Sequence, residues 1–216
     1  MKSLLVFDLD GTLVDSVKDI ADAVNYSLRL MKKPEFATEC YYKMVGNGME
    51  VLCRRALPNG TEDEVKTLIS LYKERYINNC CNSTKAYDGI KELLQSLKSN
   101  GVKLAVLSNK PQQQTDEVVS KLLGKDLFWK IIGKNEKFAA KPEPDSLNYL
   151  IDCANVERSE VCHIGDSGVD MELGKRAGVD TIGVEWGFRD RKELEDAGAV
   201  YIVKNPTELK QVIDTI

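Results

Sequence analysis

After Ser83 the chain alternates short apolar runs with helical patterns, and this alternation constrains the fold more than any other feature. Strands are predicted over 4–7, 102–107, 128–132, 161–164, 181–184 and 200–203. Helices are predicted over 90–97, 113–123, 145–153, 169–177 and 191–197, and from Pro206 onward. Asp88 is placed to cap the first of them. Strands that alternate with helices favour a Rossmann-like α/β core, a mostly parallel sheet with helices on both faces.

Residues 15–82 interrupt this pattern, because they show helical spacing and no convincing strand. Apolar residues recur at helical spacing from Val17, after an apparent capping box at 16–19, and a second box at 61–64 precedes another such run. The sequence therefore predicts an α/β core of residues 1–14 and 83–216 with an inserted helical cap of residues 15–82.

Charge and composition exclude several function classes. The 216 residues contain 30 Lys and Arg against 34 Asp and Glu, a net charge of −4, and a single histidine. An acidic chain argues against nonspecific binding to nucleic acid or to a membrane surface. The N-terminal apolar run, 4–7, is too short for a signal peptide or a membrane span. The six cysteines have no zinc-ligand spacing, and free thiols favour a cytoplasmic protein. We expect either a monomer or a small homo-oligomer.

Polar side chains follow three of the predicted strands. Asp8 and Asp10 come after the first, Ser108 after the second, and Asp166 after 161–164, while a loop offers Lys141. Ligands of parallel α/β sheets bind beyond the carboxyl ends of the strands, so these groups are expected at one edge of the sheet.

The acidic residues at this edge predict a divalent cation. Asp8 and Asp10 are two residues apart, so on an extended backbone both side chains point to one side. Such anions repel unless a cation lies between them and Asp166, and oxygen ligands suit Mg²⁺. Taken alone, the segment with Asp8 and Asp10 and the segment with Asp166 could each be a turn with a capping aspartate. Both turns occur together with Ser108 and Lys141 in the expected order along the chain, and this favours a functional site.

Four segments carry a resemblance to a known family. Asp8-Leu9-Asp10-Gly11-Thr12, Ser108-Asn109, Lys141-Pro142 and Gly165-Asp166-Ser167-x-x-Asp170 resemble, in order, the signature motifs of the haloacid dehalogenase superfamily of aspartate-based phosphatases. The helical insert resembles that superfamily's C1 cap. Further segments are similar to the phosphoglycolate phosphatase group: Val45-Gly46-Asn47-Gly48, Arg55-Ala56-Leu57 and Trp186-Gly187-Phe188-Arg189.

The resemblance implies a reaction in which Asp8 attacks phosphorus to form an aspartyl-phosphate. Asp10 would protonate the leaving oxygen and then deprotonate the hydrolytic water. Mg²⁺ would be held by the carboxylate of Asp8, the backbone carbonyl of Asp10 and the carboxylate of Asp166. The implied substrate is a small phosphorylated metabolite, with 2-phosphoglycolate as the first candidate.

The resemblance also implies that Ser108, Asn109 and Lys141 bind the phosphate, and backbone N–H groups near Gly11 can add donors. Asp170 is interpreted either as an outer residue that orients Mg²⁺ waters or Lys141, or as a helix cap. His163 lies within a predicted strand and favours a structural role.

The cap is expected to select the substrate. Gly46-Asn47-Gly48 either presents N–H groups to a small carboxylate or forms a turn with a helix cap. Arg54 and Arg55 could add charge, although helical arginines are usually solvated. Trp186 and Phe188 are expected to pack between core and cap.

Other activities stay open. A β-phosphoglucomutase-like sugar phosphomutase has a similar core and cap but would carry a cap lysine or arginine near Asn47, which the sequence does not clearly show. Pyrophosphate and nucleoside monophosphates are further possible substrates. The alternative that is not an enzyme is a phosphate-binding regulatory module, which the presence of both Asp10 and Lys141 disfavours.

Overall fold

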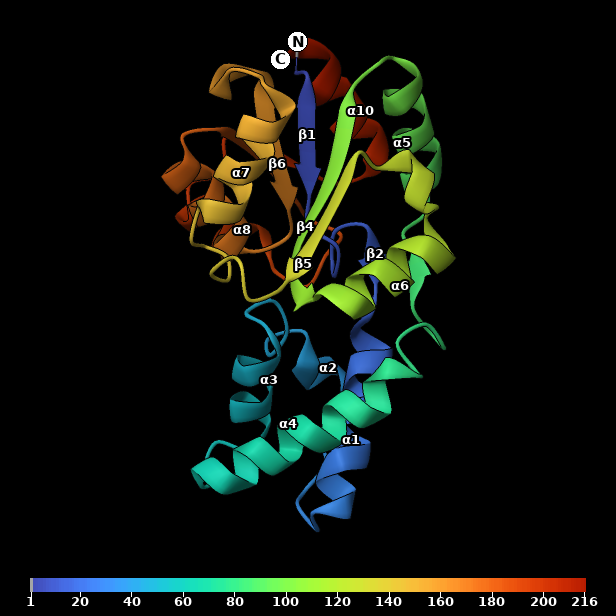
Figure 1. The fold of residues 1–216 in the computed structure, drawn as a ribbon, viewed down its shortest axis with the longest axis vertical. Coiled ribbons are helices and arrows are strands. Elements are labelled where there is room, and N and C mark those ends of the chain that lie inside the picture. The colour runs from blue at the N-terminus through green and yellow to red at the C-terminus, as the bar shows by residue number, and fades with distance from the viewer. Residues whose placement is uncertain (1) are drawn as a thin grey trace.

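The computed structural model describes residues 2–216 and contains a six-stranded parallel sheet (Figure 1). Every neighbouring pair of strands in it is parallel, which confirms the predicted α/β class. In spatial order the strands are β5 (Lys130–Lys134), β4 (Lys103–Pro111), β1 (Leu4–Phe7), β6 (Val161–Gly165), β7 (Asp180–Val184) and β8 (Tyr201–Val203).

Helices cover both faces of this sheet because side chains alternate along β1. Leu4 and Val6 belong to an apolar cluster with α7 and α8, whereas Leu5 and Phe7 belong to a cluster with α5, α6 and α10. Figure 1 shows these two groups of helices on opposite sides of the sheet. The core helices are α5 (Ile90–Ser99), α6 (Gln112–Leu122), α7 (Asp145–Ala154), α8 (Gly168–Ala177), α9 (Arg191–Asp196) and α10 (Pro206–Thr215), with 3₁₀ turns at Lys125–Leu127 and Arg158–Glu160.

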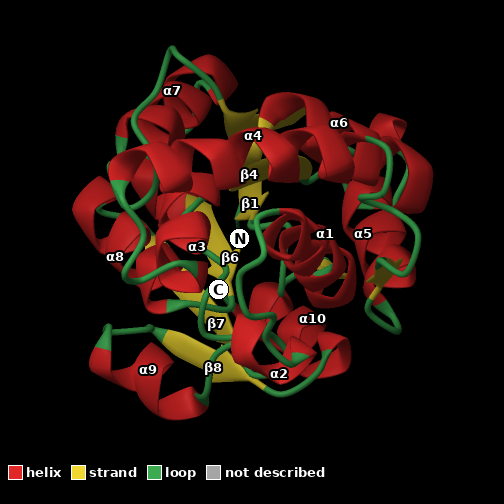
Figure 2. Cartoon of the chain, turned by 90° about the horizontal axis from the view of Figure 1, so that it is seen from below, coloured by secondary structure: helices red, strands yellow, loops and turns green. Residues whose placement is uncertain are grey.

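Four further helices lie beyond the carboxyl ends of the strands, below the sheet in Figure 1 and in front of it in Figure 2. A short antiparallel ladder of β2 (Val14–Asp15) with β3 (Lys85–Ala86) flanks this helical cap. The cap helices are α1 (Val17–Leu30), α2 (Thr38–Tyr41), α3 (Met49–Ala56) and α4 (Glu62–Ile77). The insert therefore lies over the edge of the sheet where the site was expected.

The capping box predicted at 61–64 is confirmed, since Thr61 and Glu64 exchange hydrogen bonds at the start of α4. The box predicted at 16–19 is wrong, because the side chain of Ser16 makes no cap and instead donates to Asp10. Asp19 accepts from the backbone of residues 83 and 84, so it fastens α1 to the return of the chain into the core.

Three smaller predictions also differ from the structure. Gly89, with a φ of 81°, takes the cap position predicted for Asp88, because α5 begins on a left-handed turn. The strand predicted over 128–132 lies at 130–134, because a 3₁₀ turn occupies the preceding residues. The strand predicted over 102–107 continues to Pro111 as β4. The remaining predicted strands and helices lie within two residues of the observed ones.

Within residues 2–216, no helix combines the length and the apolar character that crossing a lipid bilayer requires. All six cysteines are free thiols, and the Sγ atoms of Cys80 and Cys81 are 3.7 Å apart.

Candidate active site

The parallel register brings the predicted site residues together at the carboxyl edge of the sheet. Phe7 pairs with Ile164, and the N–H of Asp8 donates to the carbonyl of Ile164 at 2.8 Å, so Asp8 lies beside Asp166. Ser108 lies in the second half of β4, the neighbouring strand on the other side of β1. Lys141 reaches the same place from the loop between β5 and α7.

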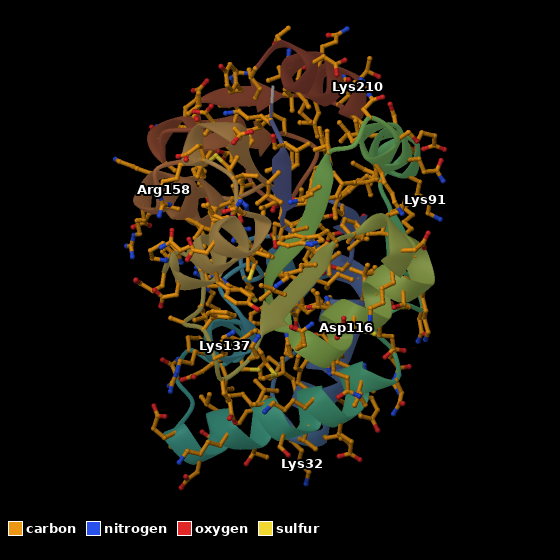
Figure 3. The ribbon with its side chains drawn as sticks, turned by 45° about the horizontal axis from the view of Figure 1, so that its top comes forward. Lys32, Lys91, Asp116, Lys137, Arg158 and Lys210 are labelled. Atoms are coloured by element: carbon orange, nitrogen blue, oxygen red, sulfur yellow. The ribbon has the colours of Figure 1, made fainter. Side chains whose placement is uncertain are left out.

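These charged side chains are buried, unlike most charges of the protein. Figure 3 shows Lys32, Lys91 and Arg158 at the outer edge of the molecule, where they are exposed. Lys141, by contrast, is 5% exposed and Asp166 is 2% exposed. Charges leave water only when other charges or hydrogen bonds compensate for the lost hydration, so the partners of each one matter.

Three carboxylates form a cluster with one ammonium group. Asp8, Asp166 and Asp170 each offer an oxygen within 4.8 Å of the others. The Nζ of Lys141 lies 2.7 Å from an oxygen of Asp8 and 2.7 Å from one of Asp170. Asp166 accepts from the backbone N–H of Phe188 at 2.7 Å. With all three carboxylates ionised, this cluster has an excess of two negative charges.

The pKa values of the cluster follow from this imbalance. Burial raises the pKa of Asp8 to about 7, because the attraction of Lys141 offsets only part of the lost hydration. Burial and the neighbouring carboxylates also hold the pKa of Asp166 well above its usual range. Burial opposes ionisation of Asp170 too, but the contacts with Lys141 and His163 lower its pKa. A divalent cation would supply the missing positive charge, and carboxylate oxygens suit a hard metal ion.

Asp170 performs both of the tasks that the sequence left open. It contacts Lys141, and His163 Nε2 lies 3.1 Å from the same oxygen. It also forms a capping box with Ser167 at the start of α8. His163 is fully buried. The third carboxylate beside Asp8 and Asp166 is that of Asp170, not that of Asp10.

The side chain of Asp10 is directed instead to Lys110, a residue that the sequence motifs did not indicate. Lys110 Nζ lies 2.7 and 2.9 Å from the two oxygens of Asp10, and Ser16 Oγ donates to the first oxygen at 2.6 Å. The sequence feature that could have indicated Lys110 is its position directly after Ser108-Asn109, at the end of a predicted strand. Its partner, 100 residues away, follows from the pairing of β4 with β1.

Asn109 connects three parts of the site. Its side-chain oxygen accepts from the backbone N–H of Lys141 at 2.8 Å. Its amide group donates to the carbonyl of Lys141 at 3.2 Å and to that of Gly46, in the cap, at 3.1 Å. The hydroxyl of Ser108 accepts from the backbone N–H of Lys110 at 3.2 Å.

The cap encloses a cavity over these residues. Its lining includes apolar side chains of the cap and, from the core, Asp8 and Asp10. Gly46 and Gly48 line this cavity, whereas Asn47 lines a separate outer groove. The remaining lining residues are Ile20, Val45, Met49, Leu52, Tyr72, Ser108, Asn109, Lys110 and Pro111.

Core residues after β7 hold the cap loop in place. Arg189 donates to the carbonyls of Tyr42 and Val45, and the ring of Phe188 meets Tyr42 edge-on at 5.5 Å. Trp186 donates to the carbonyl of Thr12 at 3.0 Å, within the core. Phe188 therefore packs between core and cap as expected.

The two cap arginines have different surroundings. Arg54 pairs with Glu50 and Glu62 at the surface, as a solvated helical arginine does. Arg55 donates to the carbonyls of Lys43 and Met44.

The sequence profile of the haloacid dehalogenase-like hydrolases matches residues 5–184. This chain belongs to that family. It is 33% identical to the phosphoglycolate phosphatase of Colwellia psychrerythraea over 215 residues, which cover 96% of this chain and 95% of that protein. It is 32% identical to the phosphoglycolate phosphatase of Haemophilus influenzae, with 97% of each chain covered.

Solved structures agree with the family. The crystal structure of a predicted phosphoglycolate phosphatase from Haemophilus somnus superposes with a TM-score of 0.92 at 28% identity, covering 98% of both chains. The chain is thus a haloacid dehalogenase-like hydrolase that resembles phosphoglycolate phosphatases over nearly its whole length.

Proposed function

We propose that the protein is a Mg²⁺-dependent phosphomonoester hydrolase that acts on 2-phosphoglycolate through an aspartyl-phosphate at Asp8. The observation that carries this proposal is the buried cluster of Asp8, Asp166 and Asp170, which Lys141 alone does not neutralise. Relatives named phosphoglycolate phosphatase, matched over nearly their whole length, support the choice of substrate.

In this proposal Mg²⁺ is held by Asp8, Asp166 and the backbone carbonyl of Asp10, with Asp170 close by. The bound ion would stabilise the negative charge of the phosphoryl group and of the attacking carboxylate. Lys141 adds a positive charge next to Asp8, and Ser108 and Asn109 border the same space.

Asp8 and Asp10 have different roles in the proposed reaction. A carboxylate oxygen of Asp8 forms a bond to phosphorus while the bond from phosphorus to the ester oxygen breaks. Asp10 gives its proton to the departing alkoxide, which leaves as glycolate. Asp10 then takes a proton from water, and the resulting hydroxide attacks phosphorus to release inorganic phosphate and free Asp8.

The cavity supports a small substrate. Its cap wall is mainly apolar, and Gly46 and Gly48, which line the same cavity as Asp8, would offer backbone N–H groups to a carboxylate. A hexose carries several hydroxyls that would lose hydrogen bonds with water against this wall. Discrimination against sugar phosphates is therefore expected.

Other expectations from the sequence become part of the same proposal. Residues 1–14 and 83–216 would form the catalytic core and residues 15–82 the cap. The free cysteines fit a reducing compartment such as the cytoplasm, and a monomer or small homo-oligomer would suffice because the described site is built within one chain.

A panel of phosphate esters tests the proposal. Purified protein with Mg²⁺ should release phosphate from 2-phosphoglycolate with a higher kcat/KM than from hexose phosphates, pyrophosphate or nucleoside monophosphates. Conversion of a hexose 1-phosphate to its 6-phosphate would favour the phosphomutase alternative. A stable phosphorylated Asp8 without phosphate release would favour the regulatory module, and no release from any ester would refute the hydrolase.

A further inference from the structure

Lys110 is the most completely paired charge near the cavity that the proposed reaction does not use. Its side chain is 3% exposed, and its Nζ contacts both oxygens of Asp10 and the hydroxyl of Tyr76, the last at 2.8 Å. An ammonium group has three N–H donors, so these three contacts use all of them. Lys110 also lines the cavity.

Tyr76 belongs to α4, so this contact joins the cap to the core. The Tyr76 side chain is buried, and its ring stacks on Tyr72 with centroids 5.1 Å apart. The ammonium group lies at the hydroxyl end of this ring, with Nζ 5.0 Å from the ring centroid. One side chain of the cap thus holds Lys110 through its hydroxyl.

Asp10 is in consequence fixed from two sides. Ser16, just before α1, donates to one of its oxygens, and Lys110 contacts both. Carboxylate rotation would break at least one of these bonds. The orientation of the side chain proposed to transfer protons therefore depends on Lys110, and the position of Lys110 depends on Tyr76.

We infer that Lys110 and Tyr76 are positioning residues, which align Asp10 for proton transfer and make that alignment depend on the seating of cap helix α4. The inference rests on the proposed function, because it assigns them to the step in which Asp10 protonates the leaving oxygen. A well-placed proton donor contributes about 10²- to 10⁴-fold to such steps, and small displacements lose part of that factor.

The nature of the leaving group separates this role from a merely structural one. Glycolate leaves as a strongly basic alkoxide that needs a proton, whereas p-nitrophenolate is a stable anion that leaves without one. The parameter kcat/KM covers steps only up to formation of the phosphoenzyme. A displaced Asp10 should therefore reduce kcat/KM for 2-phosphoglycolate much more than for p-nitrophenyl phosphate.

The test compares Tyr76→Phe with Tyr41→Phe, using both esters and Mg²⁺. Tyr76→Phe removes the hydroxyl that holds Lys110 and keeps the ring. Tyr41 is also a buried cap tyrosine, but its hydroxyl bonds to Asn25 within the cap, so Tyr41→Phe matches the chemical change without touching the core. Lys110→Met removes the contact with Asp10 directly.

For Tyr76→Phe we expect kcat/KM for 2-phosphoglycolate to fall about tenfold, with a change of at most about twofold for p-nitrophenyl phosphate. Lys110→Met should enlarge the same difference to about 100-fold. Tyr41→Phe should leave the ratio of the two esters unchanged. If Lys110→Met does not fold, the two tyrosine variants still decide the question.

An unchanged ratio in Tyr76→Phe, with the wild-type enzyme active, would overturn the inference and leave the proposed function standing. An equal loss on both esters would overturn it too, since that indicates general disturbance of the cap. Wild-type protein that releases phosphate from neither ester would refute the proposed function, and the inference with it.

Discussion

The two sides of the active site differ in the balance of their buried charges. On the side of β6, three carboxylates share the single ammonium group of Lys141, so negative charge is left over. On the side of the cap, Asp10 alone is held by Lys110 and Ser16, so its charge is matched whenever its carboxyl group is ionised. Both sides are buried and line or adjoin one cavity.

This difference indicates what each side is built to do. Unbalanced carboxylates in a low-dielectric environment raise the free energy of the protein until a cation binds, so the β6 side favours a divalent ion. The ion pair of Asp10 with Lys110 needs no further ion and keeps one orientation. The side of the site next to the cap therefore holds the Asp10 side chain in place. Substitutions that remove groups from each side in turn test this difference.

Asp8→Asn should have the largest effect, because the amide cannot attack phosphorus and lacks the charge that a cation needs. We expect phosphate release from 2-phosphoglycolate to fall at least about 10⁴-fold, in line with the loss of other enzymatic nucleophiles. The measurement is steady-state phosphate release, together with a search for phosphorylated protein after rapid quenching. Retention of full activity would exclude Asp8 as the nucleophile.

Asp166→Asn should come next, because it removes one negative charge from the unbalanced side and retains the shape of the side chain. We expect kcat to fall roughly 10²- to 10³-fold and half-maximal activity to require more Mg²⁺. A Mg²⁺ titration of activity measures both effects. Glu172→Gln, at an exposed position on α8, is the control and should match the wild type.

Gly11→Ala tests how tightly the unbalanced side is packed. Gly11 has a φ of 87°, and a Cβ there would lie 2.2 Å from an oxygen of Asp166. Gly101 has a φ of 81° with no atom within 4 Å of such a Cβ, so Gly101→Ala measures backbone strain alone. We expect both variants to lose about 1–2 kcal/mol of unfolding free energy from the positive φ.

The clash at Gly11 should remove roughly a further 1–3 kcal/mol and most of the activity, because Asp166 must move. Urea unfolding and a phosphate-release assay measure the two quantities. Equal stability and activity in both variants would show that Asp166 has room to shift.

Ser16→Ala should have the smallest effect, because Lys110 still holds both oxygens of Asp10. We expect kcat to fall about fivefold, a part of what one hydrogen bond to a charged group contributes. Ser27→Ala is the matched control, since Ser27 is a buried serine whose hydroxyl donates to a carbonyl within α1. If Ser16→Ala reached the effect of Asp166→Asn, the contrast between the two sides would be wrong.

The sequence by itself determined the alternation of strands and helices, the presence of an inserted helical segment and the set of strand-end residues that point to the family. These features are local, because side-chain periodicity and turn chemistry are written in neighbouring residues. Asp8, Ser108, Lys141 and Asp166 can therefore be chosen from the sequence alone, and the fold brings them to one edge of the sheet.

Only the tertiary structure decided which of these groups touch. Ser16 reads as a helix cap, yet its hydroxyl serves Asp10, and Lys110 finds a partner 100 residues away because β4 lies next to β1. Asp170 likewise lies in the carboxylate cluster and contacts Lys141, because β6, which precedes it, pairs with β1. Strand order and the placement of the cap over the sheet set these pairings, and both depend on how the whole apolar surface is buried.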